Sequence, residues 1–215
     1  TVSENVGEGL DGILTSAASL SLPSNVEDLK YTGSANFSGT GNELDNSITG
    51  GTGIDTLSGG DGNDTIDGGG NHNSLVGGAG NDSFIGGALD DTMDGGSGND
   101  TMEGGGRNDL YIVDSADDLV IEGPAGGTTD TVNTALPAYS LPAEVEYLAF
   151  VGAGSFSGVG NDSGNSMTGG AGNDTLDGGI GNDTLAGSAG NDVLIGGSGN
   201  DSLRGGGGDD TYYLD

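Results

Sequence analysis

The stretch Gly59–Gly69, GGDGNDTIDGG, decides the fold of this chain. It holds five glycines and three aspartates but only one large apolar residue, Ile66. So little apolar volume cannot fill a globular core. It can fill the thin interior of a solenoid, in which each coil of the chain stacks on the next.

This stretch belongs to a series of nonapeptides that keeps its register without a break. From Gly50 to Ile112 the units are GGTGIDTLS, GGDGNDTID, GGGNHNSLV, GGAGNDSFI, GGALDDTMD, GGSGNDTME and GGGRNDLYI. From Gly169 to Tyr213 they are GGAGNDTLD, GGIGNDTLA, GSAGNDVLI, GGSGNDSLR and GGGGDDTYY. Position 8 is always large and apolar, which a flexible acidic linker would not maintain.

The sequence also has a longer repeat, which includes the nonapeptides and the segments before them. SLPSNVEDLKYTG at Ser21–Gly33 matches SLPAEVEYLAFVG at Ser140–Gly152. The sequence therefore predicts two copies of one module, each a β-rich spacer followed by an array. We expect spacers at 1–49 and 113–168, and arrays at 50–112 and 169–213, the second continuing to 215. Both chain ends fall at the same phase of the module, which favours a fragment of a longer protein.

The spacers have the alternating pattern of strands. Val26, Leu29 and Tyr31 are the apolar anchors of the first spacer, and Val145, Leu148 and Phe150 are those of the second.

The composition restricts the partners of the chain. Among 215 residues there are 49 glycines, 34 acidic residues and 3 lysines or arginines, for a net charge of -31. So acidic a chain is not expected to bind nucleic acid or anionic lipid. It has no cysteine, and no apolar run approaches the ~18 residues of a membrane span. The favoured partner is a cation.

Within a unit, positions 7 to 9 suit a three-residue strand whose middle side chain points inward. Positions 1 to 6 must then turn the chain, with glycine at positions 1, 2 and 4. Asparagine or aspartate at position 5 also tolerates a left-handed backbone.

Stacked turns bring the position-6 aspartates into rows about 4.8 Å apart, where like charges repel unless a cation lies between them. Calcium takes six to eight oxygen ligands in flexible geometry, magnesium fits such turns less well, and zinc would have only His72. The candidate carboxylate ligands are Asp55, Asp64, Asp82, Asp91, Asp100, Asp109, Asp174, Asp183, Asp192, Asp201 and Asp210. The candidate carbonyl ligands belong to Gly51, Gly53, Gly60, Gly62, Gly78, Gly80, Gly96, Gly98, Gly170, Gly172, Gly179, Gly181, Gly197 and Gly199.

The units resemble the hemolysin-type calcium-binding nonapeptides of repeats-in-toxin (RTX) proteins, whose consensus is GGxGxDxUx with U large and apolar. The resemblance implies an all-β fold, a right-handed parallel β-roll (β-solenoid), with calcium bridging each unit and the next but one. The implied pairs are Asp64–Asp82, Asp82–Asp100, Asp91–Asp109, Asp174–Asp192, Asp183–Asp201 and Asp192–Asp210. About eight Ca²⁺ ions would result, at two bridged turns per ion.

Several units depart from the consensus. Asn73 stands where aspartate belongs and Asn71 where glycine belongs, which weakens the sites shared with Asp55 and Asp91. Leu89 and Arg107 replace the position-4 glycine. Upstream of the arrays, Asn46 and Asn165 hold the position-6 place and predict coils with weak or no calcium binding. We expect His72 to face solvent.

No nucleophile and base stand in a catalytic pattern, so the sequence predicts no enzyme. It predicts a calcium-binding structural module of a larger extracellular protein, and the resemblance implies a bacterial protein exported by type I secretion. One alternative is a carbohydrate- or cell-surface-binding module of an adhesin or surface-layer protein, with a cell-surface glycan as partner. Another is an accessory module of a secreted enzyme. Adjacent modules of the same protein are further candidate partners.

Overall fold

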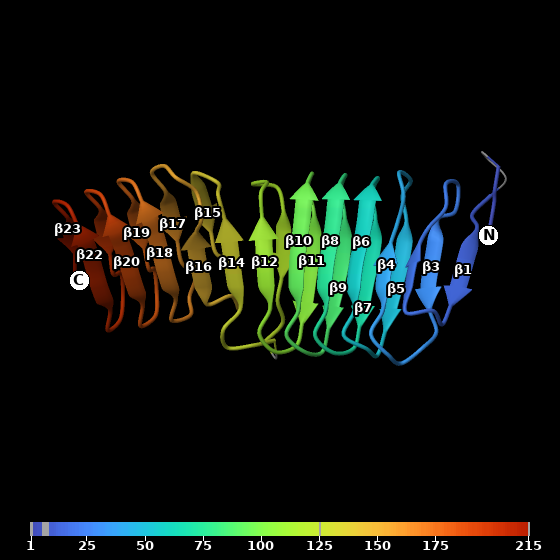
Figure 1. Ribbon diagram of the computed structural model, residues 1–215. Helices are drawn as coiled ribbons and strands as arrows, with labels where there is room; N and C mark the ends of the chain where they lie inside the picture. The colour runs from blue at the N-terminus through green and yellow to red at the C-terminus, as the bar shows by residue number, and fades with distance from the viewer. Residues whose placement is uncertain (1, 6–8, 125, 215) are drawn as a thin grey trace. The chain divides into compact units, whose positions relative to one another are not determined.

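The computed structural model describes residues 2–5, 9–124 and 126–214, and every regular element in that part of the chain is a β-strand. The chain divides into two compact units, Thr1–Ile121 and Glu122–Asp215. Each unit by itself is a parallel β-roll, as predicted (Figure 1). The described residues include no helix of the length and apolar character that crossing a membrane requires.

The first unit has two parallel sheets whose strands alternate along the chain. One contains, in spatial order, β1 (Gly12–Thr15), β3 (Asp28–Tyr31), β5 (Ser47–Gly51), β7 (Thr65–Gly69), β9 (Ser83–Gly87), β11 (Thr101–Gly105) and β13 (Leu119–Ile121). The other contains β2 (Ser19–Ser21), β4 (Ser38–Thr40), β6 (Thr56–Asp61), β8 (Ser74–Ala79), β10 (Thr92–Ser97) and β12 (Leu110–Val113).

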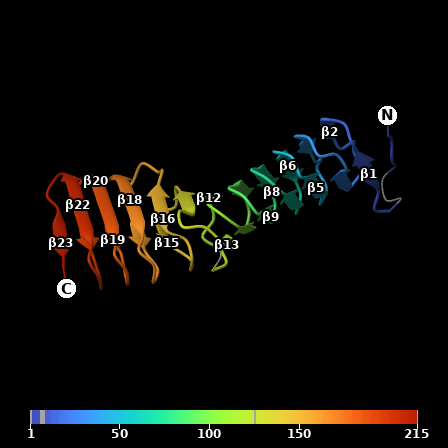
Figure 2. The same ribbon diagram turned by 90° about the horizontal axis from the view of Figure 1, so that it is seen from below.

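The second unit repeats this arrangement, and Figure 2 shows its strands side by side along the roll. One sheet contains β14 (Thr131–Thr134), β16 (Tyr147–Phe150), β18 (Ser166–Ala171), β20 (Thr184–Ala189) and β22 (Ser202–Gly207). The other contains β15 (Ala138–Ser140), β17 (Ser157–Val159), β19 (Thr175–Asp177), β21 (Val193–Ile195) and β23 (Thr211–Tyr213).

The register follows from the nonapeptide, because two units make one coil. Paired strands align residues eighteen apart, such as Leu57 with Leu75 and Ile66 with Phe84. In the arrays every aligned large apolar residue that points inward is therefore a position-8 residue. The fully buried apolar side chains of the arrays are Leu57, Ile66, Leu75, Phe84, Met93, Met102, Tyr111, Leu176, Leu185 and Leu194. One apolar side chain in nine is enough because the interior is only two side chains thick.

The strands in the arrays are often longer than the three residues that the sequence predicts. β6 and β8 continue through the glycines at positions 1 and 2 of the following unit, where Gly60 aligns with Gly78. A Cβ on Gly78, whose φ is +121°, would strike the carbonyl oxygen of Gly60. Glycine thus lets the ladder extend into the turn, because neighbouring coils approach there by backbone alone.

The spacers continue the coil, as predicted. β4 of the first spacer pairs with β6 of the first array, where Ser38 aligns with Thr56. The apolar anchors Val26, Leu29 and Tyr31 are buried in the first unit. In the second unit, β17 of the spacer pairs with β19 of the array. Val145, Leu148 and Phe150 are the corresponding buried residues.

Candidate metal centre

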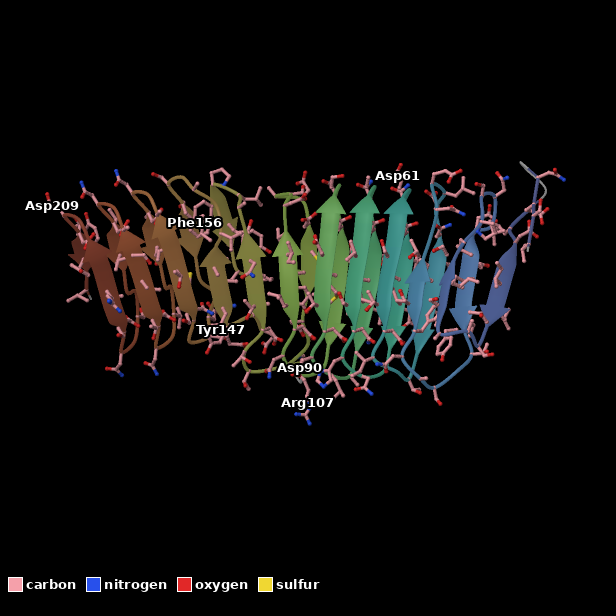
Figure 3. The ribbon with its side chains drawn as sticks, viewed as in Figure 1. Asp61, Asp90, Arg107, Tyr147, Phe156 and Asp209 are labelled. Atoms are coloured by element: carbon pink, nitrogen blue, oxygen red, sulfur yellow. The ribbon has the colours of Figure 1, made fainter. Side chains whose placement is uncertain are left out.

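The turns of each roll fall on two edges, because successive nonapeptides turn the chain at opposite ends of the strands. In Figure 3 Asp61, from an even-numbered unit, and Asp90 and Arg107, from odd-numbered units, mark the opposite edges of the first roll. We call these the even edge and the odd edge. The even edge of the first roll carries the position-6 line Asn46, Asp64, Asp82, Asp100 and Asp118; the odd edge carries Phe37, Asp55, Asn73, Asp91 and Asp109.

Along each edge the position-6 carboxylates form a hydrogen-bonded ladder. The backbone N–H of Asp64 donates to Oδ1 of Asp82 at 2.8 Å, and that of Asp82 donates to Oδ1 of Asp100 at 2.7 Å. In the second unit the N–H of Asp174 donates to Asp192 at 2.8 Å, and that of Asp183 donates to Asp201 at 3.0 Å. One oxygen of each such carboxylate therefore joins its coil to the preceding coil.

In eight array aspartates the other carboxylate oxygen, Oδ2, is buried and has no hydrogen-bond partner. These buried Oδ2 atoms belong to Asp55, Asp64, Asp82, Asp91, Asp100, Asp174, Asp183 and Asp192. Their residues are at most 2 % exposed. An unpaired buried charge is costly, so a row of such atoms indicates ligands for a cation. Asp201 and Asp210, near the end of the second array, are only partly buried.

A small cradle lies beside each unpartnered oxygen, at the position-1 glycine of the same turn. A Cβ on Gly86 would lie 2.7 Å from Oδ2 of Asp91 and 2.7 Å from the carbonyl oxygen of Gly104. On Gly77 it would strike Oδ2 of Asp82 and lie 2.5 Å from the carbonyl oxygen of Gly95. A carboxylate and a carbonyl from the next coil thus converge on a space that only glycine leaves open.

The position-1 carbonyls were not among the ligands predicted from the sequence, which named positions 2 and 4. The position-2 carbonyls of Gly51 and Gly179 accept ladder hydrogen bonds from Gly70 and Ser198, at 2.9 Å and 2.8 Å. Ligation by the carbonyls of positions 2 and 4 stays a prediction. The sequence repeat could not show which of these carbonyls face the carboxylate, because their directions depend on the turn geometry.

Burial acts strongly on the carboxyl groups of these rows. It raises the pKa of Asp64, Asp91 and Asp100 to about 6, against the lowering effect of the backbone hydrogen bonds that each accepts. The neighbouring carboxylate of Asp82 adds to the rise for Asp64 and Asp100. Burial likewise raises the pKa of Asp55, Asp82, Asp174 and Asp183. The metal-free turns thus disfavour negative charge, and a divalent cation would reverse this preference.

The donor set suits calcium. Carboxylate and carbonyl oxygens are the ligands of hard cations, and turns built on glycine tolerate the irregular geometry that calcium accepts and magnesium resists. His72 lies outside this set: it is exposed, and its Nδ1 lies 3.0 Å from the carbonyl oxygen of Asp90. The prediction that His72 faces solvent is confirmed.

Asn73 interrupts the odd edge of the first array. Its Oδ1 accepts the N–H of Asp55 at 3.0 Å, as an aspartate would. Its Nδ2 donates to the carbonyl oxygen of Asn71 at 3.1 Å, and a Cβ on Gly68 would lie 2.7 Å from this nitrogen. An amide N–H therefore faces the cradle where other turns present an unpartnered oxygen.

Asp118 extends the even edge beyond the last consensus unit. Its Oδ1 accepts the N–H of Asp100 at 3.0 Å, and its Oδ2 accepts the N–H groups of Asp114 and Ser115 at 3.2 Å and 3.1 Å. The sequence analysis did not assign Asp118 to the ladder, although it stands nine residues after Asp109 and so keeps the register. Both its oxygens have protein donors, which distinguishes it from the eight aspartates whose buried Oδ2 atoms have none.

The position-5 residues do not adopt the left-handed backbone that asparagine and aspartate tolerate. The non-glycine residues with positive φ in the described chain are Asn25, Asn71, Arg107, Glu144 and Ser188, and none holds position 5. Position-5 side chains instead form an outer ladder: Oδ1 of Asn63 accepts the N–H of Asn81, and Oδ1 of Asn81 accepts that of Asn99, both at 2.8 Å. This ladder runs opposite to that of position 6, because each side chain accepts from the following coil.

The comparisons agree with this geometry. The family model of the RTX calcium-binding nonapeptide repeat matches residues 40–75, 68–102, 76–111, 159–194 and 186–215. These segments cover more than half of the sequence and contain all the position-6 aspartates of the two arrays. The chain belongs to the RTX calcium-binding nonapeptide repeat family, and it is a calcium-binding structural module with the β-roll fold. A comparison with curated proteins gives no match.

Proposed function

We propose that this chain is an extracellular module, part of a larger secreted bacterial protein, that folds when calcium enters its turns. The observation that supports this most strongly is the row of buried, unpartnered Oδ2 atoms. Folding brings these carboxylates together at the spacing of stacked coils, and repulsion between them opposes the fold until cations bind. Binding energy then becomes folding energy.

In this proposal each ion is held by an Oδ2 atom of one turn and by carbonyl oxygens of that turn and of the turn eighteen residues later. Asp82 with the carbonyl of Gly95, and Asp91 with that of Gly104, are the best-defined examples. About eight ions in the two rolls would reduce the formal charge from -31 to about -15. The bound module therefore stays acidic and soluble.

The same linkage supports a route out of the cell. Where calcium is scarce, the acidic chain stays unfolded and can be threaded through a secretion machine of type I. In the higher calcium outside the cell it folds, and folding prevents its return. The module has a structural role and no catalytic activity of its own in this proposal.

The test is a calcium titration of the EGTA-treated chain followed by far-UV circular dichroism, with magnesium as the control ion. We expect a cooperative change from coil to β-structure with calcium and little change with magnesium. The number of ions bound follows from calorimetry of the same titration. β-Structure that is complete in EGTA, or disorder that persists at millimolar calcium, would contradict the proposal.

A matched pair of variants ties the transition to the candidate ligands. Asp64→Asn removes a buried carboxylate of the even edge, whereas Asp61→Asn removes the same charge from an exposed position of the same turn. The first should shift the calcium midpoint about tenfold, which is about 1.4 kcal/mol, and the second by less than about twofold.

A further inference from the structure

At the start of each array, on the even edge, two asparagines form a closed hydrogen-bonded network. In the first roll, Oδ1 of Asn46 accepts the N–H of Asn42 at 2.7 Å, and its Nδ2 donates to Oδ1 of Asn42 at 3.1 Å and to the carbonyl oxygen of Val26 at 3.4 Å. Nδ2 of Asn42 donates to the carbonyl oxygens of Pro23 and Val26 at 2.8 Å and 2.7 Å. We call this network an asparagine clasp.

The second roll has the same clasp at the corresponding residues. Oδ1 of Asn165 accepts the N–H of Asn161 at 2.7 Å. Nδ2 of Asn165 donates to the carbonyl oxygen of Val145 and to Oδ1 of Asn161, both at 3.1 Å. Nδ2 of Asn161 donates to the carbonyl oxygens of Pro142 and Val145 at 2.6 Å and 2.8 Å. Two separate copies thus close in the same way.

The clasp differs from an array turn by the state of its position-6 side chain. Asn46 and Asn165 are 2 % exposed, like the array aspartates, but both ends of each amide have partners. Oδ2 of Asp64, one turn further along the same edge, has none. Because the amide is neutral and satisfied by the protein, the clasped turn carries no charge that a cation must balance.

The reason for an amide at this place is the polarity of the preceding coil. An array aspartate meets a backbone N–H of the coil before it and accepts from it. Asn46 instead meets a carbonyl oxygen, that of Val26, and so requires a donor. A carboxylate there would be repelled by that carbonyl, whereas Nδ2 of asparagine bonds to it.

The odd edge of the same coil is also closed without a carboxylate. The rings of Tyr31 and Phe37 stack with centroids 4.6 Å apart, and the N–H of Phe37 donates to Oδ1 of Asp55 at 2.8 Å. In the second roll Phe150 and Phe156 stack at 4.7 Å, and Phe156 donates to Asp174 at 2.8 Å. An aromatic pair therefore begins the odd ladder of each roll.

We propose that these coils, residues 22–47 and 141–166, are cation-independent caps that keep their structure when calcium is removed and act as the template on which each array folds. The proposal rests on the calcium-dependent folding of the arrays proposed above. The clasp closes one edge of the cap, the aromatic pair closes the other, and apolar side chains fill the space between. The buried apolar residues of the two caps are Leu22, Val26, Leu29, Tyr31, Phe37, Leu141, Val145, Leu148, Phe150 and Phe156.

The test is hydrogen exchange of the full chain, measured by mass spectrometry in EGTA and in calcium. The amides of Asn42, Leu44 and Ser47 report on the first cap, because each donates within it or to the coil before it. The amides of Ser83 and Thr101 report on the array. In EGTA we expect the cap amides to exchange at least about tenfold more slowly than the array amides, and in calcium all of them to be protected.

A double variant tests the amides directly. Asn46→Asp with Asn165→Asp keeps the size of each side chain but removes the donor to Val26 and Val145. In EGTA it should lose most of the extra cap protection, at least about threefold. The matched control is Asn81→Asp with Asn173→Asp, which adds the same charge at exposed position-5 residues whose Oδ1 atoms still accept. The control should leave cap protection unchanged.

The outcomes separate this proposal from the one it rests on. If the amides of caps and arrays exchange equally fast in EGTA and are protected in calcium, the proposal of cation-independent caps is wrong. Calcium-dependent folding of the arrays would still stand. Equal protection of all amides in EGTA would overturn both. Unchanged cap protection in the Asn46→Asp, Asn165→Asp chain would show that the clasp does not hold the cap.

Discussion

The two edges of the first roll share one backbone design but differ in the atoms they present to their cradles. The even edge carries Asp64, Asp82 and Asp100 in succession, each with a buried Oδ2 that has no partner. On the odd edge Asn73 separates Asp55 from Asp91 and turns an amide toward its cradle. Exchanging one oxygen for one NH₂ group therefore changes the atom that a turn presents to its cradle, while the ladder through Oδ1 continues unchanged.

The largest effect should come from closing one cradle on the even edge. In Gly77→Ala the new Cβ would strike Oδ2 of Asp82 and crowd the carbonyl of Gly95. We expect the calcium-bound chain to lose about 1–3 kcal/mol, as overpacked sites do, measured by thermal unfolding in calcium. The control is Gly70→Ala, whose Cβ would meet nothing nearer than 3.8 Å. Equal losses in the two variants would contradict the cradle.

The next effect compares carboxylates of the two edges. Asp82 lies between two other aspartates on its edge, whereas the neighbour of Asp55 in the following coil is Asn73. We therefore compare the variants Asp82→Asn and Asp55→Asn. Calorimetry should show a weaker calcium midpoint for the first, by about tenfold, and a change of about threefold or less for the second. If Asp55→Asn weakens the calcium midpoint as much as Asp82→Asn does, the proposed difference between the two edges is wrong.

A gain of function sharpens the same comparison. Asn73→Asp restores an uninterrupted odd edge and replaces the amide in the Gly68 cradle by an oxygen. Calorimetry should find about one more ion bound, and in EGTA the chain should be less stable by about 1 kcal/mol because a new buried oxygen lacks a partner. Asn81→Asp, with an exposed side chain, should add no ion.

The smallest effect is a partial replacement of calcium by protons. The folded pKa of Asp64, Asp91 and Asp100 is raised to about 6, above the value of about 4 in the unfolded chain. Their stabilising contribution to the metal-free fold is therefore complete below about pH 4 and is lost as the pH rises through about 6. In EGTA, circular dichroism should show more β-structure at pH 5 than at pH 7. In calcium the trend should reverse, because protons compete with the ion.

Much of the fold could be predicted from the sequence because the repeat is strict. A nine-residue register with an apolar eighth position fixes two units per coil, the alignment of Leu57 with Leu75, and the inward rows. The rows of position-6 aspartates follow from the same register. Asp118 was not predicted as a member of the ladder because the residues around it do not match the nonapeptide consensus, although the spacing of nine continues.

The direction of hydrogen bonds could not be predicted in the same way. The sequence shows asparagine at positions 46, 73 and 165, but not that Asn46 faces a carbonyl oxygen while Asn73 faces a backbone N–H. Nor does it show that position-5 side chains form a ladder toward the following coil. These contacts join residues about eighteen apart, and their polarity depends on the turn geometry of both coils.

The sequence by itself determined the repeat, the burial of one apolar side chain per unit, the excess of negative charge and therefore the need for a cation. These are local or compositional properties, and the period of nine carries them along the chain. Only the tertiary structure decided which carboxylate oxygen has a partner, which carbonyl faces it, and which turns are closed by amides or stacked rings. Those properties depend on distances of about 3 Å between coils, which no single unit contains.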